Sequence, residues 1–117
     1  MNQRIQITIA AIMGFLGVAL GAFGAHGLSD TLSENMLETY KTGVLYHLIH
    51  SAVLIAIAFS SYKLIKSFAF ISAGIILFSF SLYAYSITEI TFLAMITPVG
   101  GVSFLIGWIM IVFESRR

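Results

Sequence analysis

The sequence predicts an all-α integral membrane protein in which four helices form one bundle. Of its 117 residues, 59% are hydrophobic and only 9% are charged, whereas soluble domains carry about 25% charged residues. Such a chain could not cover a surface that faces water. The apolar residues also fall into four runs, each near the ~20 residues needed to cross a bilayer. No Asp or Glu lies in the interior of these runs.

The four predicted spans form a single transmembrane domain over residues 1–117. They cover residues 5–25, 44–61, 67–86 and 91–113. A cleaved signal peptide is an alternative for the first run, with cleavage at Ala22-Phe23-Gly24, but the apolar core is long for that purpose. We therefore expect the first run to remain as a span.

The positions of Lys and Arg predict that both termini are cytoplasmic. Basic residues concentrate in the cytoplasmic loops of membrane proteins. Five of the six basic residues, including Arg116 and Arg117, flank the same ends of the spans, and only Lys41 lies on the other side. Most of the acidic residues then fall outside. The net charge of +1 is too small to indicate a nucleic-acid partner.

A short amphipathic helix is predicted at the outer surface between the first two spans, within residues 28–43. Apolar residues recur there at helical spacing, opposite charged ones. Thr31 followed by Glu34 fits a capping box, and the competing caps are Ser29, Asp30 and Ser33. The alternative is that this helix runs directly into the second span.

Small residues form stripes along the predicted helices, and the longest stripe is in the first span. Its members recur at steps of four and three residues, which places them on one helical face. In lipid, small residues let helix backbones approach closely. The predicted helix-packing residues are Ala10, Gly14, Gly17, Gly21, Gly24, Gly74, Gly100 and Gly107. The pattern alone leaves open whether these faces meet within one bundle or between two chains.

Polar residues gather toward the outer ends of the spans in this topology. His47 and His50 are three residues apart, so they lie on one face of the second span, about one and two turns inside the membrane. We predict one polar cluster where the four spans meet, with His26 facing it. Its candidate members are His26, Tyr46, His47, His50, Ser81, Tyr83 and Thr97.

Histidines inside a membrane are often functional, so three interpretations stand. The rings could be neutral and hydrogen-bonded to neighbouring helices, they could serve a small proton-coupled carrier through His47 and His50, or they could bind metal or haem. No carboxylate lies within the spans, no cysteine is present, and no nucleophile–base pair is visible. We therefore predict a non-enzymatic protein without catalytic residue, metal or cofactor. Its expected partners are the lipid bilayer and either a second copy or another membrane protein.

The Thr97-Pro98 pair leaves two interpretations of the fourth span. Thr at the N-cap with Pro at the first helical position marks a helix start, so the helix could begin at Pro98. Alternatively, one helix runs from Thr91 and is kinked at the proline.

Several motifs together resemble the YgdD-type family of small, uncharacterised, four-span membrane proteins. They are Gly21-Ala-Phe-Gly-Ala-His-Gly-Leu28, Gly43-Val-x-Tyr46 followed by His50, Phe78-Ser79-x-Ser81-Leu82-Tyr83, Ile96-Thr-Pro-Val-Gly-Gly101 and Gly107-Trp108. The resemblance covers nearly the whole chain. It implies the four-span fold and a multi-pass location in the bacterial inner membrane, and it implies no activity. One departure is Phe80, where the family pattern has a small residue, so packing at the outer end of the third span is expected to differ.

Overall fold

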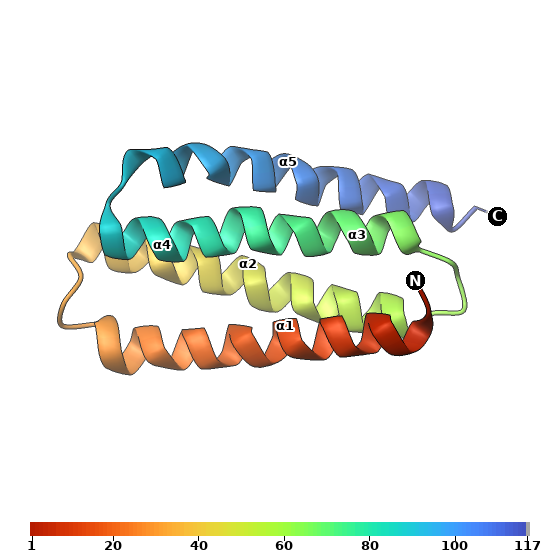
Figure 1. Ribbon diagram of the computed structural model, residues 1–117, viewed down its shortest axis with the longest axis horizontal. Helices are drawn as coiled ribbons and strands as arrows, with labels where there is room; N and C mark the ends of the chain where they lie inside the picture. Colours follow the sequence, from red (N-terminus) through yellow and green to blue (C-terminus); the bar gives the residue numbers. More distant parts are fainter. Residues whose placement is uncertain (117) are drawn as a thin grey trace.

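The chain folds into four long helical rods that lie roughly side by side (Figure 1). The computed structural model describes residues 1–116. Its elements are α1 (Gln3–Phe23), the π-helical η1 (Gly24–Leu28), α2 (Glu34–Ala58), α3 (Ile65–Gly74), the π-helical η2 (Ile75–Phe80), α4 (Ser81–Thr88) and α5 (Thr91–Glu114). Because η1 continues α1, and α3, η2 and α4 form one rod, four helices are long and apolar enough to cross a membrane. The predicted four-helix class is confirmed.

The first rod runs past its predicted end at residue 25. It continues as η1 through His26 to Leu28, and no described glycine has a positive φ. The glycines here therefore do not form a loop. Instead, Gly24 is buried inside a continuous helix, where its lack of a side chain allows a close neighbour.

The predicted outer helix is not a separate element, since α2 runs unbroken from Glu34. Its N-cap is Ser33, whose hydroxyl accepts from the Met36 amide at 3.3 Å. Thr31 is not the cap, because its own hydroxyl donates to the Leu28 carbonyl at 3.2 Å. The alternative in which the outer segment runs into the second span is therefore the correct one.

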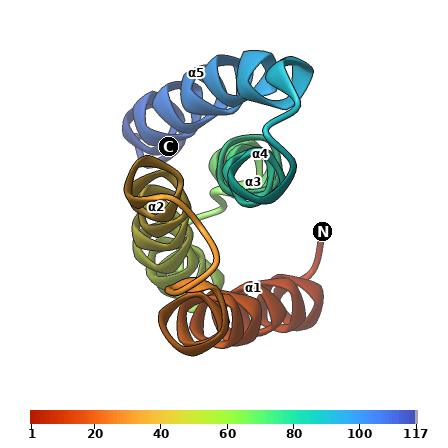
Figure 2. The same cartoon turned by 90° about the vertical axis from the view of Figure 1, so that its left-hand side faces the viewer.

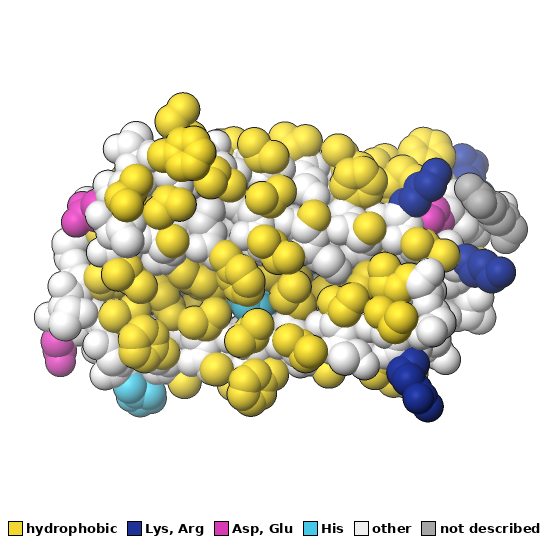
Figure 3. Space-filling model, viewed as in Figure 1, with side chains coloured by type: hydrophobic (Ala, Val, Ile, Leu, Met, Phe, Trp, Pro, Cys, Tyr) yellow, Lys and Arg dark blue, Asp and Glu magenta, His cyan; other side chains and the backbone are white. Residues whose placement is uncertain are grey.

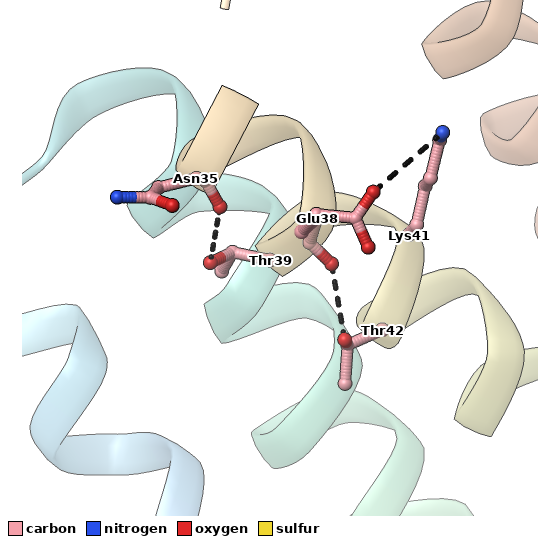
Figure 4. Close-up of polar contacts among 5 residues, drawn as sticks. All are labelled: Asn35, Glu38, Thr39, Lys41 and Thr42. Atoms are coloured by element: carbon pink, nitrogen blue, oxygen red, sulfur yellow. Dashed lines mark hydrogen bonds and ion pairs between the residues drawn. The ribbon is translucent and has the colours of Figure 1, made fainter. Parts of the chain in front are cut away.

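One side of the first turns of α2 is exposed, and its polar contacts lie within the helix (Figure 4). The Thr39 hydroxyl donates to the Asn35 carbonyl and the Thr42 hydroxyl to the Glu38 carbonyl, each at 3.0 Å. Lys41 pairs with Glu38 at 3.9 Å. All three contacts lie within one helix and near the surface, so they do not fix the position of a neighbouring helix.

The rods are arranged so that α1 and α5 lie on the outside (Figure 2). α1 packs against α2, α2 packs against the α3–η2–α4 rod, and α5 packs along that rod. The apolar core between them is made of Ala10, Met13, Leu54, Ile57, Leu64, Phe68, Ile71, Ile75 and Phe104.

The surface has the charge distribution that a membrane-spanning bundle needs. Hydrophobic side chains cover the middle of the molecule, and Lys and Arg gather at the end that holds the N-terminus and the end of α5 (Figure 3). Large side chains such as Phe15 are 72% exposed, which suits contact with lipid. The assignment of the basic end to the cytoplasm stays a prediction, and Arg117, one of the residues on which it depends, lies outside the described residues.

α5 is a single helix that contains Pro98 in its interior. A helix start at Pro98 is therefore wrong. The N-cap is Ile90, and Thr97 has a different partner, the Ser81 hydroxyl, at 2.6 Å. Proline has no N–H, so the carbonyl of Ala94 loses its usual helical donor while the helix continues.

Candidate functional site

The glycine stripe of α1 faces α2. A methyl group added at three of these glycines would meet an α2 side chain. Ala10, the other small residue of the stripe, is fully buried. The pairs are Gly17 with Leu48 Cδ2 at 2.8 Å, Gly21 with Val44 Cγ1 at 3.2 Å, and Gly24 with the ring of Tyr40. Gly14 differs, since nothing lies within 4 Å of its added methyl. The stripe therefore serves packing inside one chain, except at Gly14.

The second set of small residues joins α5 to the α3–η2–α4 rod. Methyl groups added at Gly74 and Gly107 would meet the Phe104 ring and Ile71 Cγ1 respectively, the latter at 2.5 Å. Gly100 differs from these two, because its nearest neighbours are backbone atoms of Leu77 and Phe78. All three predicted packing residues thus contact another helix.

His47 joins three helices in the middle of the bundle. Its ring is fully buried, and Nε2 lies 2.7 Å from the Met13 carbonyl of α1 while Nδ1 lies 2.8 Å from the Tyr83 hydroxyl of α4. A carbonyl only accepts. The hydrogen is therefore on Nε2, and Nδ1 accepts from Tyr83, so a neutral imidazole satisfies both contacts.

His50 joins α2 to α5 with the opposite tautomer. Its Nδ1 lies 2.7 Å from the Tyr46 carbonyl, and its Nε2 lies 3.0 Å from the indole nitrogen of Trp108. The indole N–H only donates, so Nε2 accepts and Nδ1 carries the hydrogen. The ring also stacks on Phe104, with ring centroids 3.8 Å apart. Trp108 is thus a hydrogen-bond partner of a buried histidine.

Two further polar contacts complete the links between rods. The Ser81 and Thr97 hydroxyls lie 2.6 Å apart and join α4 to α5. Tyr40, absent from the predicted cluster, donates from its hydroxyl to the Leu20 carbonyl of α1 at 2.6 Å, and its ring lies 4.9 Å from that of Tyr83. The tyrosine was missed because its helical spacing places it on the apolar face of the 28–43 segment, which predicts packing and no hydrogen-bond partner.

The predicted polar residues therefore do not form one hydrogen-bonded cluster. His47 with Tyr83, His50 with the Tyr46 carbonyl, and Ser81 with Thr97 make three separate groups. Tyr46 takes part through its backbone oxygen, while its side chain is 39% exposed.

The expectation that His26 faces this region is wrong. Its side chain is exposed, because the helix continues through it. Gly24 points toward α2, and two further residues of helical rotation turn His26 away.

Phe80, which the resemblance predicts to be a departure from the family pattern, lies next to His47. Its ring meets the imidazole edge-on with centroids 5.4 Å apart, and it lies 5.8 Å from the ring of Tyr83. The bulky side chain therefore covers the buried His47–Tyr83 pair, and α5 still approaches η2 closely at Gly100.

Glu114, at the basic end of the bundle, is a buried site that the sequence analysis missed. Its carboxylate accepts from the Ser67 amide at 2.8 Å, the Ser67 hydroxyl at 2.6 Å and the Lys66 amide at 3.0 Å. Leu64, the N-cap of α3, offers no side-chain cap. A carboxylate from α5 thus caps α3, where the helix dipole favours negative charge.

These features define a four-span membrane protein whose polar side chains join helices to one another. A family model described as "Protein of unknown function (DUF423)" matches residues 20–101, and the chain belongs to this family. The resemblance to the YgdD-type family is therefore confirmed.

Three relatives illustrate the match, and all are named as membrane proteins. The chain is 47% identical over 121 residues to UPF0382 membrane protein YwdK of Bacillus subtilis, covering 98% of each. It is 39% identical over 122 residues to UPF0382 inner membrane protein YgdD of Escherichia coli, covering 100% of this chain and 93% of that one. It is 43% identical over 116 residues to a UPF0382 membrane protein of Haemophilus influenzae, covering 95% and 93%. No solved structure matches.

Proposed function

We propose that the protein is a non-enzymatic membrane protein that acts by binding other membrane components, and that its buried histidines hold the helices together. The observation that carries this proposal is the state of His47 and His50. Both ring nitrogens of each histidine are already bonded to other groups of the chain. Neither ring has a free lone pair to offer a metal or a free position to offer a substrate.

A proton carrier is less well supported for the same reason. Adding a proton to His50 would place an N–H at Nε2, opposite the indole N–H of Trp108. Two donors cannot bond to each other, so Trp108 would have to move. A metal ion would likewise have to displace Trp108, or displace Tyr83 from His47.

Proton flux into proteoliposomes separates these functions. We expect the wild-type protein to leave the flux at the level of empty liposomes, and His50→Gln to leave it unchanged while lowering the thermal stability in detergent. Trp108→Phe is the matched control, because it removes the same hydrogen bond without touching the imidazole. A flux that requires His50 and survives Trp108→Phe would contradict the proposal.

The free face of α1 around Gly14 is where we propose that a second copy of the chain binds. Gly17 is covered by α2, whereas Gly14 has open space and its neighbours Phe15 and Val18 are 72% and 65% exposed. A small residue between large ones allows close helix approach in lipid. Native mass spectrometry should therefore show a dimer that Gly14→Leu weakens, without loss of helix content. A protein that stays monomeric at all concentrations in mild detergent would contradict this part.

A further inference from the structure

A hollow with a volume of about 400 Å³ lies at one end of the bundle. Lys and Arg side chains gather at this same end (Figure 3). It is formed by the start of α1, the end of α2 and the connection from α2 to α3. Its polar lining residues are Gln3, Gln6, Ser60, Ser61, Tyr62 and Lys63. The volume is in the range of small-molecule sites, and none of the residues bonded to the histidines lines it.

Gln6 is the unusual residue of this hollow. It lies on α1 and is only 8% exposed, yet no hydrogen bond joins its side-chain amide to another described residue. Among the described residues, the fully enclosed polar side-chain atoms without a partner are the hydroxyls of Ser51, Ser72 and Ser79. The Gln6 amide also lacks a partner but is not one of these enclosed groups, so it is accessible from the hollow that Gln6 lines. The amide is therefore available to bond to a molecule that occupies the hollow.

The groups around the hollow offer mostly donors. The Ser60 oxygen accepts from the Tyr62 amide at 3.1 Å, which leaves its O–H to donate. Lys63 is exposed and brings a positive charge, and the one ion pair within residues 1–116 is between other residues, at the opposite end. No acidic residue is among the described residues that line this hollow. Glu114 lines a neighbouring hollow that Lys63 also borders, and its carboxylate is already bonded to amides of α3. The free donors and the charge of Lys63 therefore suit an acceptor with negative charge.

The position of the hollow identifies the kind of anion. It lies where the apolar helix α1 begins and the apolar helix α2 ends. This is the depth at which lipid headgroups meet the hydrocarbon core. Basic pockets between spans at this depth bind anionic headgroups. We propose that the hollow binds the phosphate of an anionic phospholipid, with the Gln6 amide and the Lys63 ammonium as donors.

Native mass spectrometry of the delipidated protein in detergent tests this site. Dioleoyl phosphatidylglycerol is titrated against dioleoyl phosphatidylcholine, which has the same acyl chains and no net charge, and against inorganic phosphate. We expect tighter binding of phosphatidylglycerol, and a loss of about fivefold in its affinity for Lys63→Gln, which is the factor expected for one basic residue near the surface. Gln6→Leu should also weaken binding although it changes no charge.

Lys66→Gln is the matched control, because Lys66 is exposed, lies near the same end and does not line the hollow. Its affinity for phosphatidylglycerol should stay near that of the wild type. Equal losses for Lys63→Gln and Lys66→Gln would overturn the proposal, since the binding would then reflect only the charge of this end. Phosphate bound as tightly as phosphatidylglycerol, or equal binding of the two lipids, would also overturn it. Lys63 is exposed, so its variant tests the site even if Gln6→Leu fails to fold.

Discussion

α1 and α5 are the two outer helices of the bundle, and they are held by different kinds of contact. Side chains of α2 hold α1: Tyr40 bonds to its Leu20 carbonyl and His47 to its Met13 carbonyl. α5 makes side-chain contacts too, but it also makes a direct contact between backbones, since Gly100 lies against the backbone of the α3–η2–α4 rod. Glu114 at its end binds backbone amides of α3.

This difference determines how each helix responds when a substitution adds atoms at its contact surface. A side chain can rotate away from an added methyl group, whereas a backbone inside a helix cannot move without disturbing its hydrogen bonds. The position of α5 should therefore be fixed within narrow limits, while α1 can adjust against α2. The following substitutions test this contrast, from the largest expected effect to the smallest.

Gly100→Ala should have the largest effect. Its methyl group would lie 2.6 Å from the carbonyl carbon of Leu77, so α5 must separate from the rod. Overpacking of this kind costs about 3 kcal/mol. The measurement is the free energy of unfolding in detergent micelles, followed by helical circular dichroism.

The neighbouring Gly101→Ala is the control for Gly100→Ala. Its methyl group would meet only the Phe78 ring, at 3.9 Å, an ordinary contact distance. Both substitutions change helix propensity equally, so they differ only in the neighbour. Similar stabilities for the two variants would show that the backbone contact does not determine how α5 packs.

Glu114→Gln should have the second largest effect and lower the free energy of unfolding by about 2 kcal/mol, because hydrogen bonds to a charged acceptor are stronger than those to a neutral one. The new amide N–H₂ would also oppose one of the donors at Lys66 and Ser67. Chemical unfolding in micelles measures the loss. Glu38→Gln, which removes only an exposed ion pair, is the control, and an equal loss there would argue against a structural role of the cap.

Much of this architecture is predictable from the sequence because it depends on local pattern. Span lengths follow from apolar runs, and the spacing of Gly17, Gly21 and Gly24 correctly defines one face of the rod formed by α1 and η1. That these residues meet α2 could not be derived, since a helical period says which residues share a face but not which neighbour covers it.

The polar contacts were less predictable, because a sequence pattern does not say which residues of other helices lie next to a given side chain. The pairs His50–Trp108 and Glu114–Ser67 are 58 and 47 residues apart in the chain. Each residue alone has an ordinary interpretation, an interfacial tryptophan or a charge that ends a span. Only the packing of α5 against the other rods brings these partners together, and that packing depends on the approach at Gly100.

Tyr40→Phe tests a side-chain contact of α1 and should cost only about 0.6 kcal/mol, the average for a hydrogen bond between membrane helices. The Leu20 carbonyl keeps its bond to the Gly24 amide within the helix, so no acceptor is left unpaired. The phenyl ring would still cover Gly24. Thermal unfolding in detergent measures the change, and a loss as large as that of Gly100→Ala would remove the distinction between the two outer helices.

Gly14→Ala should have the smallest effect on stability, within about 0.5 kcal/mol of the wild type. Nothing lies within 4 Å of the added methyl group, and alanine favours the helix more than glycine does. The variant therefore separates stability from association. The added methyl group contacts nothing within the chain, whereas it would meet a second chain that packs closely at Gly14. Unfolding in micelles and native mass spectrometry on the same sample measure the two quantities. Unchanged stability with a weaker dimer would place the contact surface on α1, whereas a large loss of stability would show that α1 is packed more tightly than its open face indicates.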